Sequence, residues 1–212
     1  PDQGAPVSPT ERAAALAGRL LDRHGVVTRS AVAAEAVPGG FSAVYGVLKA
    51  MEEAGRARRG YFVEGLGGAQ FALPGAVDRL RSMREGADGG QSERVALAAT
   101  DPANPFGAAL AWPDPAGDHA HSPRRMAGAY VVLVDGALAG YAERGGRSLL
   151  TFGADDGLLD GFAAGLGRLV SARQVRSLQV QRIDGGPPAD QPLVAHLRRH
   201  GFADHPRGLI RR

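Results

Sequence analysis

The apolar residues near the start of the chain recur at helical spacing. Ser8, Pro9 and Glu11 have the form of a helix start, because the serine caps the first turn, proline suits the first helical position and the glutamate completes a capping box. The apolar residues that follow repeat every three or four positions until Gly25. This pattern predicts an amphipathic helix over residues 9–24 with one buried face.

Two shorter helices and two strands are predicted after the first helix. A helix over residues 28–36 begins with Thr28 as its cap, and a third helix spans 41–54. Residues 56–63 and 69–73 are expected to be strands joined by a glycine-rich loop. Helix, helix, turn, helix and hairpin is the order of a winged helix, in which the third helix commonly enters the major groove of DNA.

A glycine-rich segment over residues 86–91 predicts a boundary between two domains. We expect an α+β protein, with a winged-helix domain and linker over residues 1–90 and a mixed α/β, barrel-like domain over 91–212, made of an antiparallel sheet plus helices. The strands predicted for the second domain are 95–99, 129–134, 138–143, 148–152 and 177–181, and its helices are 158–172 and 192–200.

Composition narrows the possible chemistry. The absence of cysteine excludes disulfides, cysteine-ligated zinc and thiol nucleophiles. The net charge is +3 and Lys49 is the only lysine, so arginine carries nearly all of the positive charge. Arginine suits phosphate contacts, but a high arginine content also follows from a GC-rich coding sequence.

The sequence also bears on where the protein is located. No apolar run reaches the roughly 20 residues of a membrane span, so we expect a cytoplasmic location without membrane contact. The missing initiator methionine suggests a piece of a longer polypeptide.

The outward face of the third helix is one candidate nucleic-acid surface. Ser42, Tyr45 and Lys49 share this face at helical spacing and offer a hydroxyl, a phenol and an ammonium to phosphates or bases. Many winged helices instead pack against protein, and Glu52 and Glu53 weaken the case for DNA. Both interpretations stay open at this point.

The first wing strand is the stronger candidate. Arg56, Arg58 and Arg59 place positive charge along it, and Tyr61 adds a ring for stacking. Arg29, near the start of the second helix, could add a phosphate contact. The alternative is an edge strand whose charges protect it from aggregation.

Other polar residues suggest chemistry more weakly. His119 and His121 have a spacing that suits a metal but lack a clear third ligand, so no metal site is expected. Asp155, Asp156 and Asp160 sit where aspartates favour a helix start, which favours capping over acid–base catalysis.

A base-excision interpretation stays open as a minor alternative. Gln179 and Gln181 alternate along one strand and Asp184 follows, and glycosylases use polar residues to position water at a flipped base. Trp112 is either a stacking platform or a core residue, and its neighbour Pro113 favours the core.

Three segments resemble the large helicase-related (Lhr) family of superfamily-2 ATP-dependent helicases. They are residues 59–75, residues 100–107 with Trp112 and Pro113, and the ending that combines Gly201-Phe202 with residues 206–209. The resemblance extends over essentially the whole chain and is closest to the far C-terminal part of those proteins. It implies winged helices and a role in oligomerisation for this region.

The resemblance also implies that the ATPase motor lies elsewhere. The sequence has neither a G-x-x-x-x-G-K-[ST] loop nor an Asp-Glu-x-His motif, so ATP and Mg²⁺ are expected in the parent helicase and no cofactor in this segment. We expect a non-catalytic module for DNA repair. Its expected partners are single-stranded or duplex DNA, other domains of the parent protein and a second copy of the chain. A packing scaffold or a DNA glycosylase module are the alternatives.

Overall fold

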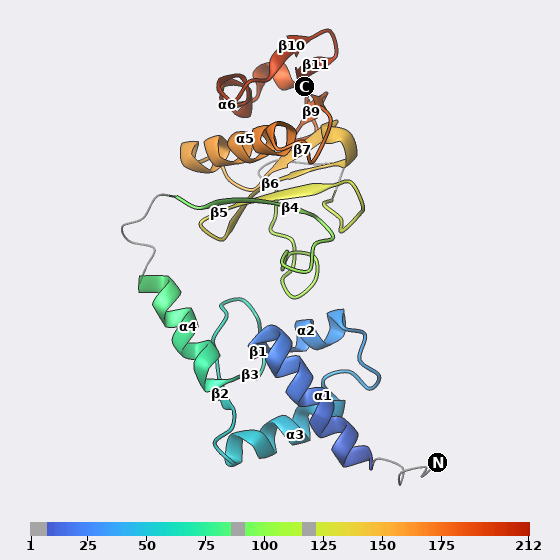
Figure 1. Ribbon diagram of the computed structural model, residues 1–212, viewed down its shortest axis with the longest axis vertical. Helices are drawn as coiled ribbons and strands as arrows, with labels where there is room; N and C mark the ends of the chain where they lie inside the picture. The colour runs from blue at the N-terminus through green and yellow to red at the C-terminus, as the bar shows by residue number, and fades with distance from the viewer. Residues whose placement is uncertain (1–7, 86–91, 116–121) are drawn as a thin grey trace. The chain divides into compact units, whose positions relative to one another are not determined.

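The computed structural model describes residues 8–85, 92–115 and 122–212 (Figure 1). The chain divides into two compact units, one made of residues 1–90 with 108–110 and the other of residues 91–107 with 111–212. The linker predicted at residues 86–91 lies outside the described residues. None of the described helices is both long and apolar enough to cross a membrane.

The first unit is a winged helix. Its small sheet is antiparallel in the order β1-β3-β2, with Val26 opposite Ala72 and Arg59 opposite Phe71. The pattern did not predict β1, because two residues are too few to show alternation. The elements are α1 (Pro9–His24), β1 (Val26–Val27), α2 (Arg29–Ala34), α3 (Ser42–Glu53), β2 (Arg58–Gly60), β3 (Gln70–Ala72) and α4 (Pro74–Glu85).

Local caps explain where the helices of this unit begin. The Glu11 amide donates to Ser8 Oγ at 3.2 Å and the Ser8 amide donates to Glu11 Oε2 at 2.8 Å, which confirms the predicted capping box. Thr28 Oγ1 accepts from the Ala31 amide at 3.1 Å at the start of α2. Gly25 ends α1 with φ at +66°, a backbone conformation that glycine adopts at little cost.

One apolar core holds the three helices and the wing together. The face of α1 that the sequence predicts as buried packs against α3 and β3, and Phe71 of β3 is fully buried at the centre. All three residues of β3 are buried, whereas Arg58 and Arg59 of β2 are exposed. Because β3 is the middle strand, β2 forms an edge of the small sheet. The buried cluster comprises Ala17, Leu20, Leu21, Val27, Val32, Phe41, Val44, Leu48 and Phe71.

The second unit contains an open five-stranded sheet in the order β4-β5-β6-β7-β9. The predicted barrel is therefore wrong, because in the described residues the two edge strands β4 and β9 do not pair and the sheet does not close. Nor is the sheet wholly antiparallel, since β7 and β9 are parallel. Its strands are β4 (Arg94–Ala98), β5 (Tyr130–Val134), β6 (Ala137–Ala142), β7 (Ser148–Thr151) and β9 (Arg182–Ile183).

Helix α5 (Asp156–Ser171) covers one face of this sheet (Figure 1). Glycines allow the close approach: a Cβ on Gly161 would lie 2.4 Å from Val134 Cγ2, and one on Gly165 would lie 2.6 Å from Val132 Cγ1. Helix and strand backbones that pack this closely leave no room for water between them, so solvent is excluded from the sheet face beneath α5.

A smaller sheet and helix complete the unit. Strand β8 (Leu178–Val180) does not join the large sheet but pairs with β11 (Gly208–Arg211), which pairs with β10 (Ala203–His205). Helix α6 (Leu193–Arg199) packs against α5, on the side of α5 away from the large sheet (Figure 1). The β10–β11 hairpin was not predicted, because its polar residues show no alternation.

The connector between β4 and β5 is ordered by polar contacts in its described part. Arg125 Nη1 donates to the carbonyls of Asn104 and Phe106 at 2.7 and 3.1 Å. Trp112 stacks on Phe106 and meets Tyr141 edge to face, so it belongs to the packing of this connector.

Candidate nucleic-acid interface

The predicted residues of α3 do not form a free cationic face. Tyr45 is 37% exposed, and its ring centroid lies 5.8 Å from that of Phe41 and 6.0 Å from that of Phe71, so the ring packs against the edge of the core. Lys49 Nζ lies 3.6 Å from Glu53 Oε1 one turn along the helix. Ser42 is exposed at the helix start. The ammonium charge on this face is therefore partly offset.

Helix α3 also holds one arginine of the wing. Arg59 Nε lies 3.2 Å from Glu52 Oε1, which directs this guanidinium back toward the helix. Arg58 precedes it on β2 and so points to the opposite face of the strand. In the part of the chain that the structure describes, the exposed side chains of Arg56 and Arg58 have no carboxylate or hydrogen-bond partner.

The residue after β2 presents an aromatic ring to solvent. Tyr61 is 87% exposed, the most exposed of the large hydrophobic side chains in the described residues. Arg58 lies on β2, Arg56 lies two residues before the strand and Tyr61 follows it directly. An exposed ring and unpaired guanidinium groups along one segment of chain can offer stacking and phosphate contacts. The sequence predicted this combination, with Arg59 as a further member.

Buried Gln70 shapes the loop that follows Tyr61, a role that was not predicted from the sequence. Its Oε1 accepts from the amides of Phe62 and Val63, both at 2.9 Å. Its Nε2 donates to the carbonyls of Val63 at 2.9 Å and Leu66 at 2.7 Å. All four hydrogen-bonding positions of the amide are thus used to fix the wing. A glutamine at the start of a strand gave no signal of this role.

Arg29 lies between an aromatic ring and the wing loop. Its guanidinium carbon is 5.3 Å from the centroid of the Phe41 ring. A Cβ on Gly68 would lie 3.4 Å from Arg29 Nε, so the wing loop passes close to the same side chain. Arg29 therefore connects α2 with α3 and the wing by cation–π and packing contacts, and its position beside the wing is compatible with a phosphate contact.

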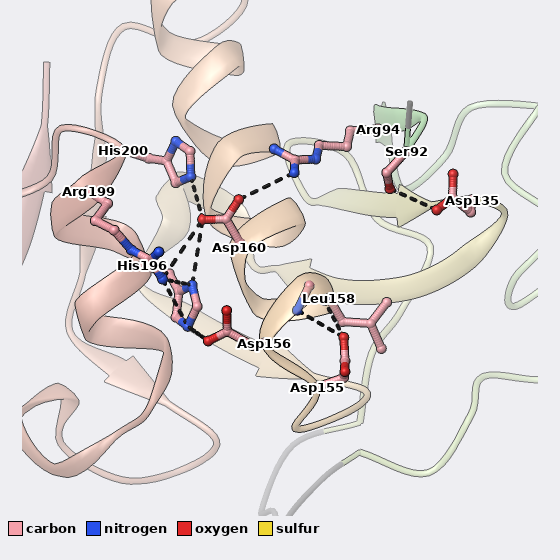
Figure 2. A network of polar contacts seen from close by, with 11 residues as sticks. Ser92, Arg94, Asp135, Asp155, Asp156, Leu158, Asp160, His196, Arg199 and His200 are labelled. Carbon is pink, nitrogen blue, oxygen red and sulfur yellow. Dashed lines mark hydrogen bonds and ion pairs between the residues drawn. The ribbon is translucent and has the colours of Figure 1, made fainter. Parts of the chain in front are cut away.

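A second polar group of residues lies in the other unit, where α5 meets α6 (Figure 2). Asp160 Oδ1 accepts from His200 Nε2 at 2.9 Å, and Asp160 Oδ2 lies 3.3 Å from Arg94 Nη2. Asp155 caps α5 by accepting from the Gly157 amide at 2.9 Å, as the sequence predicted. The prediction that all three aspartates serve as caps is wrong for Asp160, which joins β4, α5 and α6.

The buried His196 has polar side chains beside both of its ring nitrogens. Arg199 Nη2 lies 2.6 Å from His196 Nδ1, and Asp160 Oδ1 lies 3.6 Å from the same nitrogen. His196 Nε2 lies 3.2 Å from Asp156 Oδ1. Because His196 belongs to α6 and both aspartates belong to α5, these contacts order α6 against α5.

Replacing Asp160 by asparagine is expected to lower the free energy of unfolding by about 1–2 kcal/mol at pH 7. Burial by itself raises the pKa of the Asp160 carboxyl, but the hydrogen bond and charge of His200, with His196 and Arg94, outweigh it, so the net pKa is lowered. A lowered folded-state pKa stabilises the protein above about pH 4, and this stabilisation is lost as pH falls through the folded pKa.

Urea unfolding of the wild type and D160N at pH 7 and pH 3 measures this difference. D204N is the matched control, because Asp204 pairs with Arg198 at 2.8 Å but its side chain is 75% exposed. A D160N effect of equal size at both pH values would contradict the assignment.

The remaining candidates are a metal site and the polar residues of the base-excision interpretation. No group of three histidine or acidic side chains suited to a metal occurs among the described residues, and the pair His119 and His121 lies outside them. Asp184 accepts from the Thr151 amide at 2.8 Å and from Thr151 Oγ1 at 2.7 Å. Gln179 Nε2 lies 3.1 Å from His205 Nδ1.

The chain is similar to proteins of one family along nearly its whole length. Residues 6–92 match the family model of the winged-helix domain of the large helicase-related protein. The chain is 52% identical over 209 residues to a Mycolicibacterium smegmatis protein named "Lhr helicase/ probable uracil glycosylase", covering 94% of this chain and 14% of that protein. It is 40% identical over 211 residues to the Escherichia coli "Lhr helicase/uracil glycosylase", covering 96% and 13%. The chain thus spans about one seventh of the length of these relatives.

Proposed function

Because the chain belongs to the large helicase-related (Lhr) family and corresponds to a C-terminal region of it, we propose that it is a nucleic-acid-binding and assembly module of an ATP-dependent DNA helicase that acts in repair. On this proposal ATP and Mg²⁺ are bound elsewhere in the parent protein. The module binds single-stranded or duplex DNA and contacts neighbouring domains or a second copy.

The observation that carries the proposal is the composition of the wing edge. Arg56 and Arg58 are exposed and unpaired in the described residues, and Tyr61, which directly follows β2, is 87% exposed. An unpaired guanidinium gains a full phosphate contact on binding, whereas one already paired with a carboxylate, such as Arg59, must first exchange partners. The wing therefore supports DNA binding better than the face of α3.

Exchanging Arg56, Arg58 and Arg59 together for alanine is expected to weaken DNA binding about tenfold at 100 mM salt and to lower the salt slope by about two units. Fluorescence anisotropy with labelled single-stranded and duplex oligonucleotides, over a salt series, measures both quantities. The matched control is R12A/R19A/R79A, which removes the same charge from exposed positions on α1 and α4.

The outcome decides between the proposed function and its main alternative. Equal weakening by the control would mean that net charge rather than the wing determines binding. A folded wild-type chain that binds no DNA at 50 mM salt would rule out the nucleic-acid role and favour the packing scaffold.

A uracil glycosylase activity is a second candidate, favoured by the printed names of both relatives. Within this chain, the carboxylate nearest to such a role is Asp184, which borders a hollow of about 150 Å³ together with Thr151 and Gln191. Release of uracil from uracil-containing DNA without ATP, lost on replacing Asp184 by asparagine, would support it. Unchanged release in D184N would remove Asp184 from the mechanism.

A further inference from the structure

A hollow of about 480 Å³ lies where α5 ends in the second unit. Of the described residues that border it, three are arginines and none is an aspartate or glutamate, so cationic side chains predominate there. We call it the arginine hollow. Its lining residues are Val170, Ser171, Arg173, Val175, Arg176 and Arg212.

The three guanidinium groups of the arginine hollow have no protein partner in the described residues. Neither an ion pair within 4.0 Å nor a side-chain hydrogen bond occurs at Arg173, Arg176 or Arg212. Some other arginines of the same unit are paired, and Arg198, for example, donates to Asp204 at 2.8 Å. Like charges that gather without counter-charges repel one another, so the cluster is expected to gain free energy when it binds an anion.

Arg173 stands at a backbone position that disfavours its side chain. Its φ is +57°, and the Gln174 amide donates to the Leu169 carbonyl at 2.9 Å around it, which is the helix ending that usually has glycine at this place. A side chain here strains the backbone. Strain of this kind commonly accompanies a functional side chain, and here the side chain lines the hollow.

Arg211 holds one residue of the hollow in place. Its Nη2 donates to Ser171 Oγ at 2.6 Å, which ties the last strand to the end of α5. The guanidinium also lies close to two glycines: a Cβ on Gly167 would lie 3.3 Å from Nη1, and one on Gly201 would clash with it. Ser171 and the end of α5 are therefore fixed before any ligand binds, which reduces the entropy lost on binding.

We propose that the arginine hollow binds consecutive phosphates of a nucleic-acid backbone and is a second DNA contact of this chain, separate from the wing. Three guanidinium groups around one hollow suit the closely spaced phosphates of a strand, and the absence of an aromatic lining indicates backbone contacts without base stacking. The inference takes its partner class from the proposed function but rests on different residues.

Exchanging Arg173, Arg176 and Arg212 together for alanine tests the proposal in the full 212-residue chain. With a labelled 20-nucleotide dT strand and a 20-base-pair duplex, we expect about tenfold weaker binding and a salt slope lowered by about two units. The control R147A/R182A/R207A removes the same charge from exposed, unpaired positions of the same unit.

Arg173→Gly separates binding from folding. Glycine relieves the left-handed backbone, so Tm is expected to stay equal or rise, while DNA binding weakens about threefold through loss of one guanidinium. A structural role for Arg173 predicts the opposite, a lowered Tm with unchanged binding, and that result would overturn the proposal.

The remaining outcomes distinguish this proposal from the proposed function. Wild-type binding that the wing variant weakens but the arginine-hollow variant does not would overturn only the hollow. Equal losses in the hollow and control variants would also overturn it, as would equal affinity for a poly-glutamate peptide of matched charge, which would indicate an acidic protein segment as the occupant. A wild-type chain that binds neither oligonucleotide overturns both proposals.

Discussion

Gly140→Ala is expected to destabilise the second unit by about 2–3 kcal/mol. Gly140 lies in β6 beneath α5, and an added Cβ would lie 2.3–2.4 Å from three atoms of the Phe162 ring. That ring is fully buried in the core between the sheet and α5, so it cannot move aside without shifting the helix. Thermal unfolding monitored by circular dichroism measures the effect as a lowered Tm.

Gly18→Ala is the matched control for this substitution. Gly18 lies within α1, nothing lies within 4 Å of a Cβ built there, and alanine is the better helix former. We expect G18A to stabilise the first unit by up to about 1 kcal/mol. A G140A protein as stable as the wild type would mean that α5 does not approach the sheet as closely as described.

Gln70→Ala is expected to destabilise the winged helix by about 2–3 kcal/mol and to weaken DNA binding. The substitution leaves the amides of Phe62 and Val63 and the carbonyls of Val63 and Leu66 without the partner that joins them. Because these contacts fix the loop that follows Tyr61, the ring would sample many positions and would lose entropy on binding.

Two measurements separate the stability effect from the binding effect. Urea unfolding gives the loss of stability, and anisotropy below the unfolding transition gives the loss of affinity. The control is Q174A, because the side chain of Gln174 is exposed at the end of α5. Retention of full DNA affinity by folded Q70A would show that the order of the wing loop does not matter for binding.

Features that depend on residues close together in the sequence were predicted, whereas features that depend on contacts between distant residues were not. The capping box at Ser8 and the cap at Thr28 are local, so the boundaries of α1 and the start of α2 were predicted correctly. The pairing of Arg59 with Glu52 is not local: it depends on how β2 returns along α3, and charge counting alone placed Arg59 among the free cations.

The same distinction explains the errors in the second unit. Alternating residues identified β5, β6 and β7, but the pattern within a strand says nothing about whether the sheet closes, and the barrel was wrong. Gln70 and Asp160 were missed or misassigned because their roles depend on partners brought in by tertiary folding: the wing backbone for Gln70 and two histidines of α6 and its end for Asp160.

The parallel pairing of β7 with β9 imposes an order on folding. Strands β4 to β7 follow one another in the sheet as they do in the chain, so they can form by successive pairing of neighbours. Strand β9 can join β7 only after α5 and β8 have crossed over, since Ser148 pairs with Arg182. Refolding is therefore expected to close the last edge of the sheet late, and residues 182–183 should exchange their amide protons faster than those of the central strands.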